Sequence, residues 1–261
     1  MKEANLIKIF TDPIKKCVDY KPVFGTTQKD GVSLPEFRKL YGGDPLYSWV
    51  GLDSDYIYSA HKAAGGITSF YRQLGIGCER LVRTIIKDSL SLNEEQVNWS
   101  YEYKNSQQKT AKLSLDARID TNHLNDSNRI AIINDWCHDA LLALGNNRQG
   151  IKGAVFEVRQ GYKSADSKRQ NADLRNAVRA YNENYLPVVM VMSNQLNEAI
   201  RSRYASSQIL ILSGRMNRNT EECTYAFFKD IVGFDLECFF NKNQKMIRAE
   251  IEGILQALVT P

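Results

Sequence analysis

The residues from Gly153 to Asp173 decide the fold: Gly153-Ala-Val-Phe-Glu-Val-Arg-Gln-Gly-Tyr-Lys163, followed by Ser-Ala-Asp-Ser-Lys-Arg-Gln-Asn-Ala-Asp173. The first half belongs to a stretch, 151–163, that largely alternates apolar and polar residues, the period expected of a β-strand. The second half predicts a helix over 167–184 that begins with polar and basic side chains. A strand, a short loop and a helix in this order are typical of an α/β fold.

Further elements are expected on both sides of this unit. Apolar residues at helical spacing predict helices at 67–90, 130–144 and 195–204. Alternating or short apolar runs predict strands at 97–103, 109–120, 188–192 and 209–212. The C-terminal region is expected to be mostly helical. This order predicts an α/β fold with a mixed central β-sheet flanked by helices.

The domain organisation is expected to be simple. No linker, repeat or low-complexity tract interrupts the chain, so we expect a single domain over 1–261. Residues 1–65 are rich in aromatic residues, Gly, Pro and Asp, and are expected to be an irregular N-terminal elaboration. The core is expected at 66–214 and a C-terminal helical part at 215–261.

Composition is typical of a soluble globular protein and permits an anionic partner without demanding one. Hydrophobic residues make up 43% of the 261 residues and charged residues 25%, with a formal net charge of +4. Between Arg159 and Arg203 the chain has eight Lys or Arg residues against four acids. Such a mildly basic chain permits a nucleic-acid partner.

The spacing of the cysteines and the lengths of the apolar runs indicate the cellular compartment. The five cysteines form no CxxC pair and are odd in number, which argues against a zinc site or a disulfide framework. A reduced, cytoplasmic setting is therefore expected. No signal peptide and no apolar run near the ~18 residues of a membrane span is recognised, so no membrane association is expected.

An acid and a lysine share the polar face of strand 151–163. Glu157, Arg159 and Lys163 alternate with apolar residues that point the other way. Asp116 and Asp120 lie on the polar face of strand 109–120, so Asp116 can meet Glu157 or Lys163 if the two strands pair. Carboxylates there can hold Mg²⁺, and a lysine can polarise the attacking water of a phosphodiester hydrolysis. The alternative is an ordinary solvated strand face, with Asp116 paired to Arg118.

The segment Asp166-Ser-Lys-Arg-Gln-Asn171 is suited to DNA contact. Lys and Arg side chains can make bidentate hydrogen bonds to guanine, and Gln and Asn side chains can make them to adenine. The alternative is a capped helix N-terminus on a wet surface. The three histidines lack metal-ligand spacing and are expected to be structural.

Together these residues resemble type II restriction endonucleases of the PD-(D/E)XK nuclease superfamily. Gly75-Ile-Gly-Cys-Glu79 resembles the helix whose acid borders the metal site in that superfamily. Asp116 in Leu-Ser-Leu-Asp-Ala-Arg-Ile resembles the lone Asp of the middle strand. The segment from Lys163 to Asn171 resembles the lysine and the recognition residues that follow it. The resemblance spans about 75–214.

One position departs from that pattern. The usual acid-X-Lys would place an acid at 161, where this chain has Gly161. Glu157 and Asp173 are the acids available to replace it. Glu157-Val-Arg159 is a further option, with Arg159 in the place of the lysine.

The resemblance implies a Mg²⁺-dependent endonuclease of a restriction-modification system that cuts both strands of double-stranded DNA and acts as a homodimer. The implied catalytic residues are Asp116, Glu157, Lys163 and Glu79, and the implied metal ligands are Asp116, Glu157, Asp120 and Asp173. The implied DNA contacts are Arg159, Ser164, Asp166, Lys168, Arg169, Gln170, Asn171 and Arg175. Two alternatives stay open: a structure-selective repair or junction nuclease, and a non-catalytic DNA-binding protein on a degenerate nuclease fold, which Gly161 suggests.

Overall fold

The computed structural model describes residues 2–25, 27, 30–104, 108–162 and 167–260, with the backbone alone at 104, 111 and 167–169. The chain divides into two compact units where a single domain over 1–261 was expected. One unit is Cys78–Asn241, and the other combines Lys2–Gly77 with Lys242–Pro261. We describe each unit by itself.

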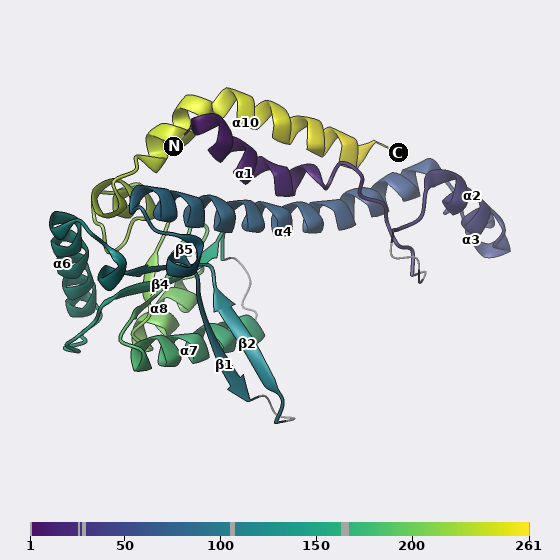
Figure 1. Cartoon of the computed structure of the whole chain (residues 1–261). Helices are drawn as coiled ribbons and strands as arrows, with labels where there is room; N and C mark the ends of the chain where they lie inside the picture. The colour runs from purple at the N-terminus through teal and green to yellow at the C-terminus, as the bar shows by residue number, and fades with distance from the viewer. Residues whose placement is uncertain (1, 26, 28–29, 105–107, 163–166, 261) are drawn as a thin grey trace. The chain divides into compact units, whose positions relative to one another are not determined.

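The first unit is built on a mixed four-stranded sheet, which confirms the predicted α/β class (Figure 1). Its strands are β3 (Ala117–Asp120), β4 (Gly153–Arg159), β5 (Leu186–Val191) and β6 (Leu210–Leu212), in that spatial order. β3 is antiparallel to β4, whereas β4, β5 and β6 run parallel. The strands predicted at 188–192 and 209–212 are confirmed within two residues, and β4 is shorter than the predicted 151–163.

Helices cover both faces of this sheet. The helices of the first unit are α6 (Ser127–Ala143), α7 (Ser167–Asn182) and α8 (Glu198–Ser206), with short turns α5 (Glu94–Val97), η1 (Thr121–His123), α9 (Thr224–Ala226) and the π-helix η2 (Phe227–Val232). α7 and α8 pack on one face, where Ala177 and Ile200 join a buried cluster with Val189 and Val191 (Figure 1). On the other face, Phe227 packs between Phe156 of the sheet and Trp136 of α6.

The strand expected at 109–120 is divided in two. Asp116 is a bend between β2 (Thr110–Leu115) and β3. β2 pairs with β1 (Trp99–Lys104) in a separate antiparallel hairpin, whereas β3 joins the four-stranded sheet. The break places Asp116 at the beginning of the sheet strand instead of in the middle of a regular ladder.

The second unit corrects the expectation that residues 1–65 are irregular. This region forms α1 (Glu3–Lys15), α2 (Leu34–Gly42), α3 (Pro45–Trp49) and the beginning of α4 (Asp55–Ser89). α4 and α10 (Leu236–Val259) each contribute residues to both units. Apolar side chains of α1 are buried, and Val32, Phe37 and Tyr58 form a small aromatic core around α2. The helical spacing in α1 is regular, but the Pro, Gly and aromatic residues around it obscured the pattern.

Two glycines of α4 differ in what surrounds them. A Cβ on Gly77 would lie 2.3 Å from the carbonyl oxygen of Phe10 in α1, whereas a Cβ on Gly75 would meet nothing within 4 Å. Gly77 thus permits the close approach of α1 to α4.

These two positions give a matched test of the packing. Gly77→Ala forces α1 away from α4, and we expect it to lower the free energy of unfolding by about 1–3 kcal/mol. Gly75→Ala removes a flexible residue from a helix and should raise that free energy by about 0.5–1 kcal/mol. Denaturant unfolding of the two variants measures both effects, and equal effects would contradict the described contact.

Candidate active site

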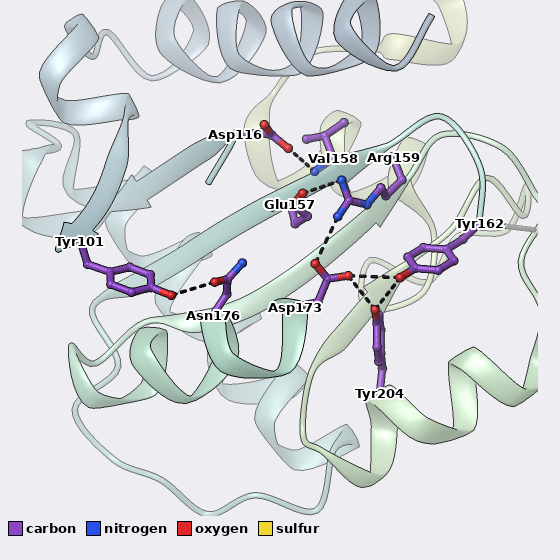
Figure 2. Close-up of polar contacts among 9 residues, drawn as sticks. All are labelled: Tyr101, Asp116, Glu157, Val158, Arg159, Tyr162, Asp173, Asn176 and Tyr204. Atoms are coloured by element: carbon purple, nitrogen blue, oxygen red, sulfur yellow. Dashed lines mark hydrogen bonds and ion pairs between the residues drawn. The ribbon is translucent and has the colours of Figure 1, made fainter. Parts of the chain in front are cut away.

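Asp116 and Glu157 come from neighbouring strands. β3 pairs with β4 so that Ala117 lies opposite Phe156, and Asp116 and Glu157 follow one residue beyond that pair. The backbone N–H of Asp116 donates to the carbonyl of Phe156 at 2.9 Å. The side chain of Asp116 accepts from the N–H of Val158 at 2.7 Å through Oδ2 (Figure 2). The strand pairing therefore brings Asp116 to the Glu157 end of β4, one of the two meetings that the sequence allowed if these strands paired.

Arg159 is held between two acids. Glu157 and Arg159 lie two residues apart on β4 and share one face. Arg159 Nη1 lies 2.5 Å from Glu157 Oε1, and Nη2 lies 3.1 Å from Asp173 Oδ1 (Figure 2). The side chains of Glu157 and Arg159 are 17% and 15% exposed, so both charges are largely removed from water. Arg159 Nε is buried and has no hydrogen-bond partner among the described residues.

Asp173 is part of a buried network behind Arg159. Its Oδ1 accepts from Arg159, and its Oδ2 accepts from the hydroxyl of Tyr204 at 2.6 Å. The hydroxyl of Tyr162 lies 2.9 Å from that of Tyr204 and 3.3 Å from the same Asp173 oxygen. With both oxygens engaged by protein donors, Asp173 is placed to orient Arg159 and not to bind a metal.

Burial and mutual repulsion perturb the acids of the cluster. Burial raises the pKa of Glu157 to about 8, with Arg159 opposing the rise and the charge of Asp116 adding to it. Burial, followed by the charge of Asp116, raises the pKa of Glu79 on α4 to about 7. Burial also raises the pKa of Asp116, against its hydrogen bond from Val158. These carboxyl groups therefore lie close enough to influence one another, and a cation is favoured beside them.

Whether this acid cluster can hold a metal ion depends on how many protein ligands that ion needs. Within the described residues, no three His, Cys, Asp or Glu side chains converge in a way that could hold a metal ion. Mg²⁺ in enzymes is usually held by one or two carboxylates, with water and substrate phosphate completing its shell. Asp116 and Glu157 can supply such a pair, with Glu79 nearby.

The remaining acids and the lysine lie elsewhere. Asp120 is at the far end of β3, where it accepts from the hydroxyl of Tyr185 at 2.6 Å and from the N–H of Asn122. Asp120 is therefore not brought to Asp116. Lys163, Ser164 and Asp166 lie outside the described residues. A Cβ on Gly161 would lie 3.0 Å from Ser193 Oγ, which leaves little room for an acid at that position.

The predicted DNA contacts are divided between the surface and the interior. Lys168 and Arg169 lie in the first turn of α7, and Arg175 is exposed farther along the same helix. Gln170 is buried, and its side-chain oxygen accepts from Arg203 Nη1 of α8 at 2.6 Å. The exposed Asn171 accepts from Arg203 Nη2 at 2.8 Å. Gln170 and Asn171 are therefore held by the protein itself, and Arg159 lies in the acid cluster.

Sequence reasoning missed several residues of this region. Tyr204 and Arg203 contact α7 across more than thirty residues of sequence. Tyr162 was expected only as a core residue. Arg83 of α4 donates to the backbone carbonyl of Asp116 at 2.6 Å and supports the bend there. The concentration of Lys and Arg between 159 and 203 was a signal for Arg203, but no sequence pattern pointed to Tyr204 or Arg83.

Comparisons with known proteins do not assign the chain to a family. No family model, no curated protein and no solved structure matches the chain. None of the described helices is both long and apolar enough to cross a membrane.

The raised pKa of Glu157 predicts a pH-dependent stability. An acid whose pKa is higher in the folded state binds more protons when folded, so its contribution falls as pH rises from about 4.5 to about 8. We expect the melting temperature to decline over this range, and the decline to be smaller in Glu157→Gln.

The control is Glu102→Gln, which removes an exposed glutamate from β1. Its melting temperature should follow the same pH slope as the unmodified chain. Parallel slopes for all three proteins in a thermal-unfolding series would show that Glu157 is not the group responsible.

Proposed function

We propose that the chain is a Mg²⁺-dependent endonuclease of double-stranded DNA, with a PD-(D/E)XK-type site made by Asp116 and Glu157-Val-Arg159. The observation that supports this most strongly is the meeting of Asp116, Glu157 and Arg159 at one end of the β3–β4 pair. Of the options left open by Gly161, this one places an acid and a cationic residue two positions apart on a single strand face. The helix with Glu79 and the parallel β4–α7–β5 unit fit the order that the resemblance implies.

The charges of the cluster suit phosphodiester hydrolysis. Asp116 and Glu157 would hold the cation, with Glu79 beside them. When bound, Mg²⁺ supplies a Lewis acid for the phosphate and a water that ionises more easily. The buried Nε–H of Arg159 has no acceptor among the described residues, and the guanidinium would place a positive charge beside the phosphate. Arginine stays protonated, so Arg159 would stabilise negative charge and not take a proton from water.

The proposed partner is duplex DNA, cut at a specific site as in type II restriction endonucleases. Lys168, Arg169 and the exposed Arg175 on α7 are proposed to contact the DNA, with Lys163 and its neighbours. A palindromic site would require a homodimer, because each strand needs its own active site. The five unpaired cysteines support a cytoplasmic setting.

A cleavage assay tests the proposal. Plasmid DNA incubated with the purified protein should give discrete fragments with Mg²⁺ and none with EDTA. Asp116→Asn, Glu157→Gln and Arg159→Met should each lower the cleavage rate by about 100-fold or more, because each removes a charge from the site.

Two exposed acids provide matched controls. Asp88→Asn and Glu102→Gln remove a carboxylate outside the cluster and should cleave like the unmodified chain. A Mg²⁺-dependent smear in place of discrete fragments would favour a structure-selective repair or junction nuclease. Cleavage unaffected by all three cluster substitutions would refute the assigned site.

One observation favours a second candidate, a non-catalytic DNA-binding protein. Arg159 is already paired with Glu157 and Asp173, and in Glu157-Val-Arg159 the place of the motif's lysine is taken by an arginine, which cannot act as a base. An intact plasmid together with a salt-sensitive mobility shift would support this candidate over the nuclease.

A further inference from the structure

We propose that Tyr204 is a positioning residue that fixes the guanidinium of Arg159 through Asp173. The inference rests on the proposed function for its catalytic meaning, but the arrangement of Arg159 can be measured without any cleavage. Tyr204 lies outside the residues that suggested the site, and Tyr204 and Asp173 come from two different helices, α8 and α7 (Figure 2).

Asp173 of α7 is buried and contacts Arg159 of β4 and Tyr204 of α8. Its side chain is 3% exposed, so its oxygens must obtain hydrogen bonds from the protein. Tyr204 Oη is 2.6 Å from Asp173 Oδ2, the shortest of the contacts to that carboxylate. Burial and the hydrogen bond to Asp173 raise the pKa of Tyr204, which keeps the hydroxyl protonated as a donor.

The guanidinium of Arg159 is held by two acids. A guanidinium held by one acid alone can rotate about that contact, whereas two acids fix its plane. Glu157 contacts Nη1 and Asp173 contacts Nη2, so Arg159 is fixed only while Asp173 keeps its orientation. Tyr204 and Tyr162 hold the second oxygen of Asp173 and thereby limit its rotation. This leaves Arg159 Nε in a defined direction, buried and without a described partner.

The chain contains a matched pair of tyrosines that separates positioning from packing. Tyr185 also donates to a buried aspartate, Asp120, at 2.6 Å. Both tyrosines and both aspartates are buried, so Tyr204→Phe and Tyr185→Phe remove the same kind of hydrogen bond. Asp120 contacts Asn122 and, at 4.0 Å, Lys152, and among the described residues none of its hydrogen bonds or ion pairs reaches Arg159.

The experiment measures Arg159 directly by side-chain NMR of the full-length protein labelled at arginine, with the signals assigned by their loss in Arg159→Lys. In the unmodified chain the Nη protons of Arg159 should be distinct and slow to exchange with water. Tyr204→Phe should accelerate that exchange roughly tenfold, in line with the loss of one hydrogen bond to a charged group. Tyr185→Phe should leave it unchanged.

A double-substitution series tests whether Tyr204 acts through Asp173. Asp173→Asn should release Arg159 at least as strongly as Tyr204→Phe. Adding Tyr204→Phe to Asp173→Asn should then have no further effect on the exchange of the Arg159 protons, because the two residues act in one chain of contacts.

DNA cleavage kinetics give a second test, separate from the NMR measurement of Arg159. If the unmodified chain cleaves DNA, Tyr204→Phe should lower kcat roughly tenfold with KM within about twofold, and Tyr185→Phe should change neither. Unchanged Arg159 exchange in Tyr204→Phe, or an equal change in Tyr185→Phe, would overturn the inference. Absence of cleavage by the unmodified chain would instead count against the proposed function, and the NMR result would still decide the positioning role.

Discussion

The buried guanidinium of Arg159 between Glu157 and Asp173 is the interaction on which the account depends. A charge removed from water is tolerated in a protein only when opposite charges and hydrogen bonds compensate it. β4 supplies Glu157 and Arg159 from one face, and α7 covers that face with Asp173. Substituting Arg159 would leave Glu157 and Asp173 buried without the cation they share, so the sheet, the covering helix and the cluster constrain one another.

The same constraint explains why acids accumulate beside Arg159. The cluster places Asp116 and Glu79 near Glu157, and the mutual repulsion, added to burial, raises the pKa of Glu157 to about 8 and of Glu79 to about 7. Such a concentration of negative charge is unfavourable for folding and favours a cation. Perturbed carboxyl groups of this kind gather at functional sites more often than elsewhere. In the proposed phosphoryl chemistry, a cation and an arginine would share the charge of the phosphate.

The sequence predicted the elements with strong periodicity and missed those set by distant contacts. The alternation in β4, the Asp126 cap of α6 and the apolar run of β5 were sufficient to predict the mixed sheet. The alternation of apolar and polar residues continues through Asp116, although the backbone passes there from the hairpin to the four-stranded sheet. The bend at Asp116 therefore could not be predicted from that alternation. For the site, the sequence allowed Asp116 to meet Glu157 if the two strands paired, and the register of β3 and β4 shows that they pair. The sequence also offered Arg159 in the place of the lysine, but not its contact with Asp173 or the hydrogen bond of Tyr204, since these partners lie on other elements.

The most direct test of the central claim is the binding of Mn²⁺, as a spectroscopic substitute for Mg²⁺, measured by electron paramagnetic resonance on the full chain without DNA. The account predicts a bound Mn²⁺ whose affinity falls by at least about tenfold in Asp116→Asn and in Glu157→Gln, because each removes a proposed ligand. Asp88→Asn should bind Mn²⁺ like the unmodified chain. Binding that is absent, or that neither substitution of the cluster weakens, would contradict the assignment of Asp116 and Glu157 as a cation site.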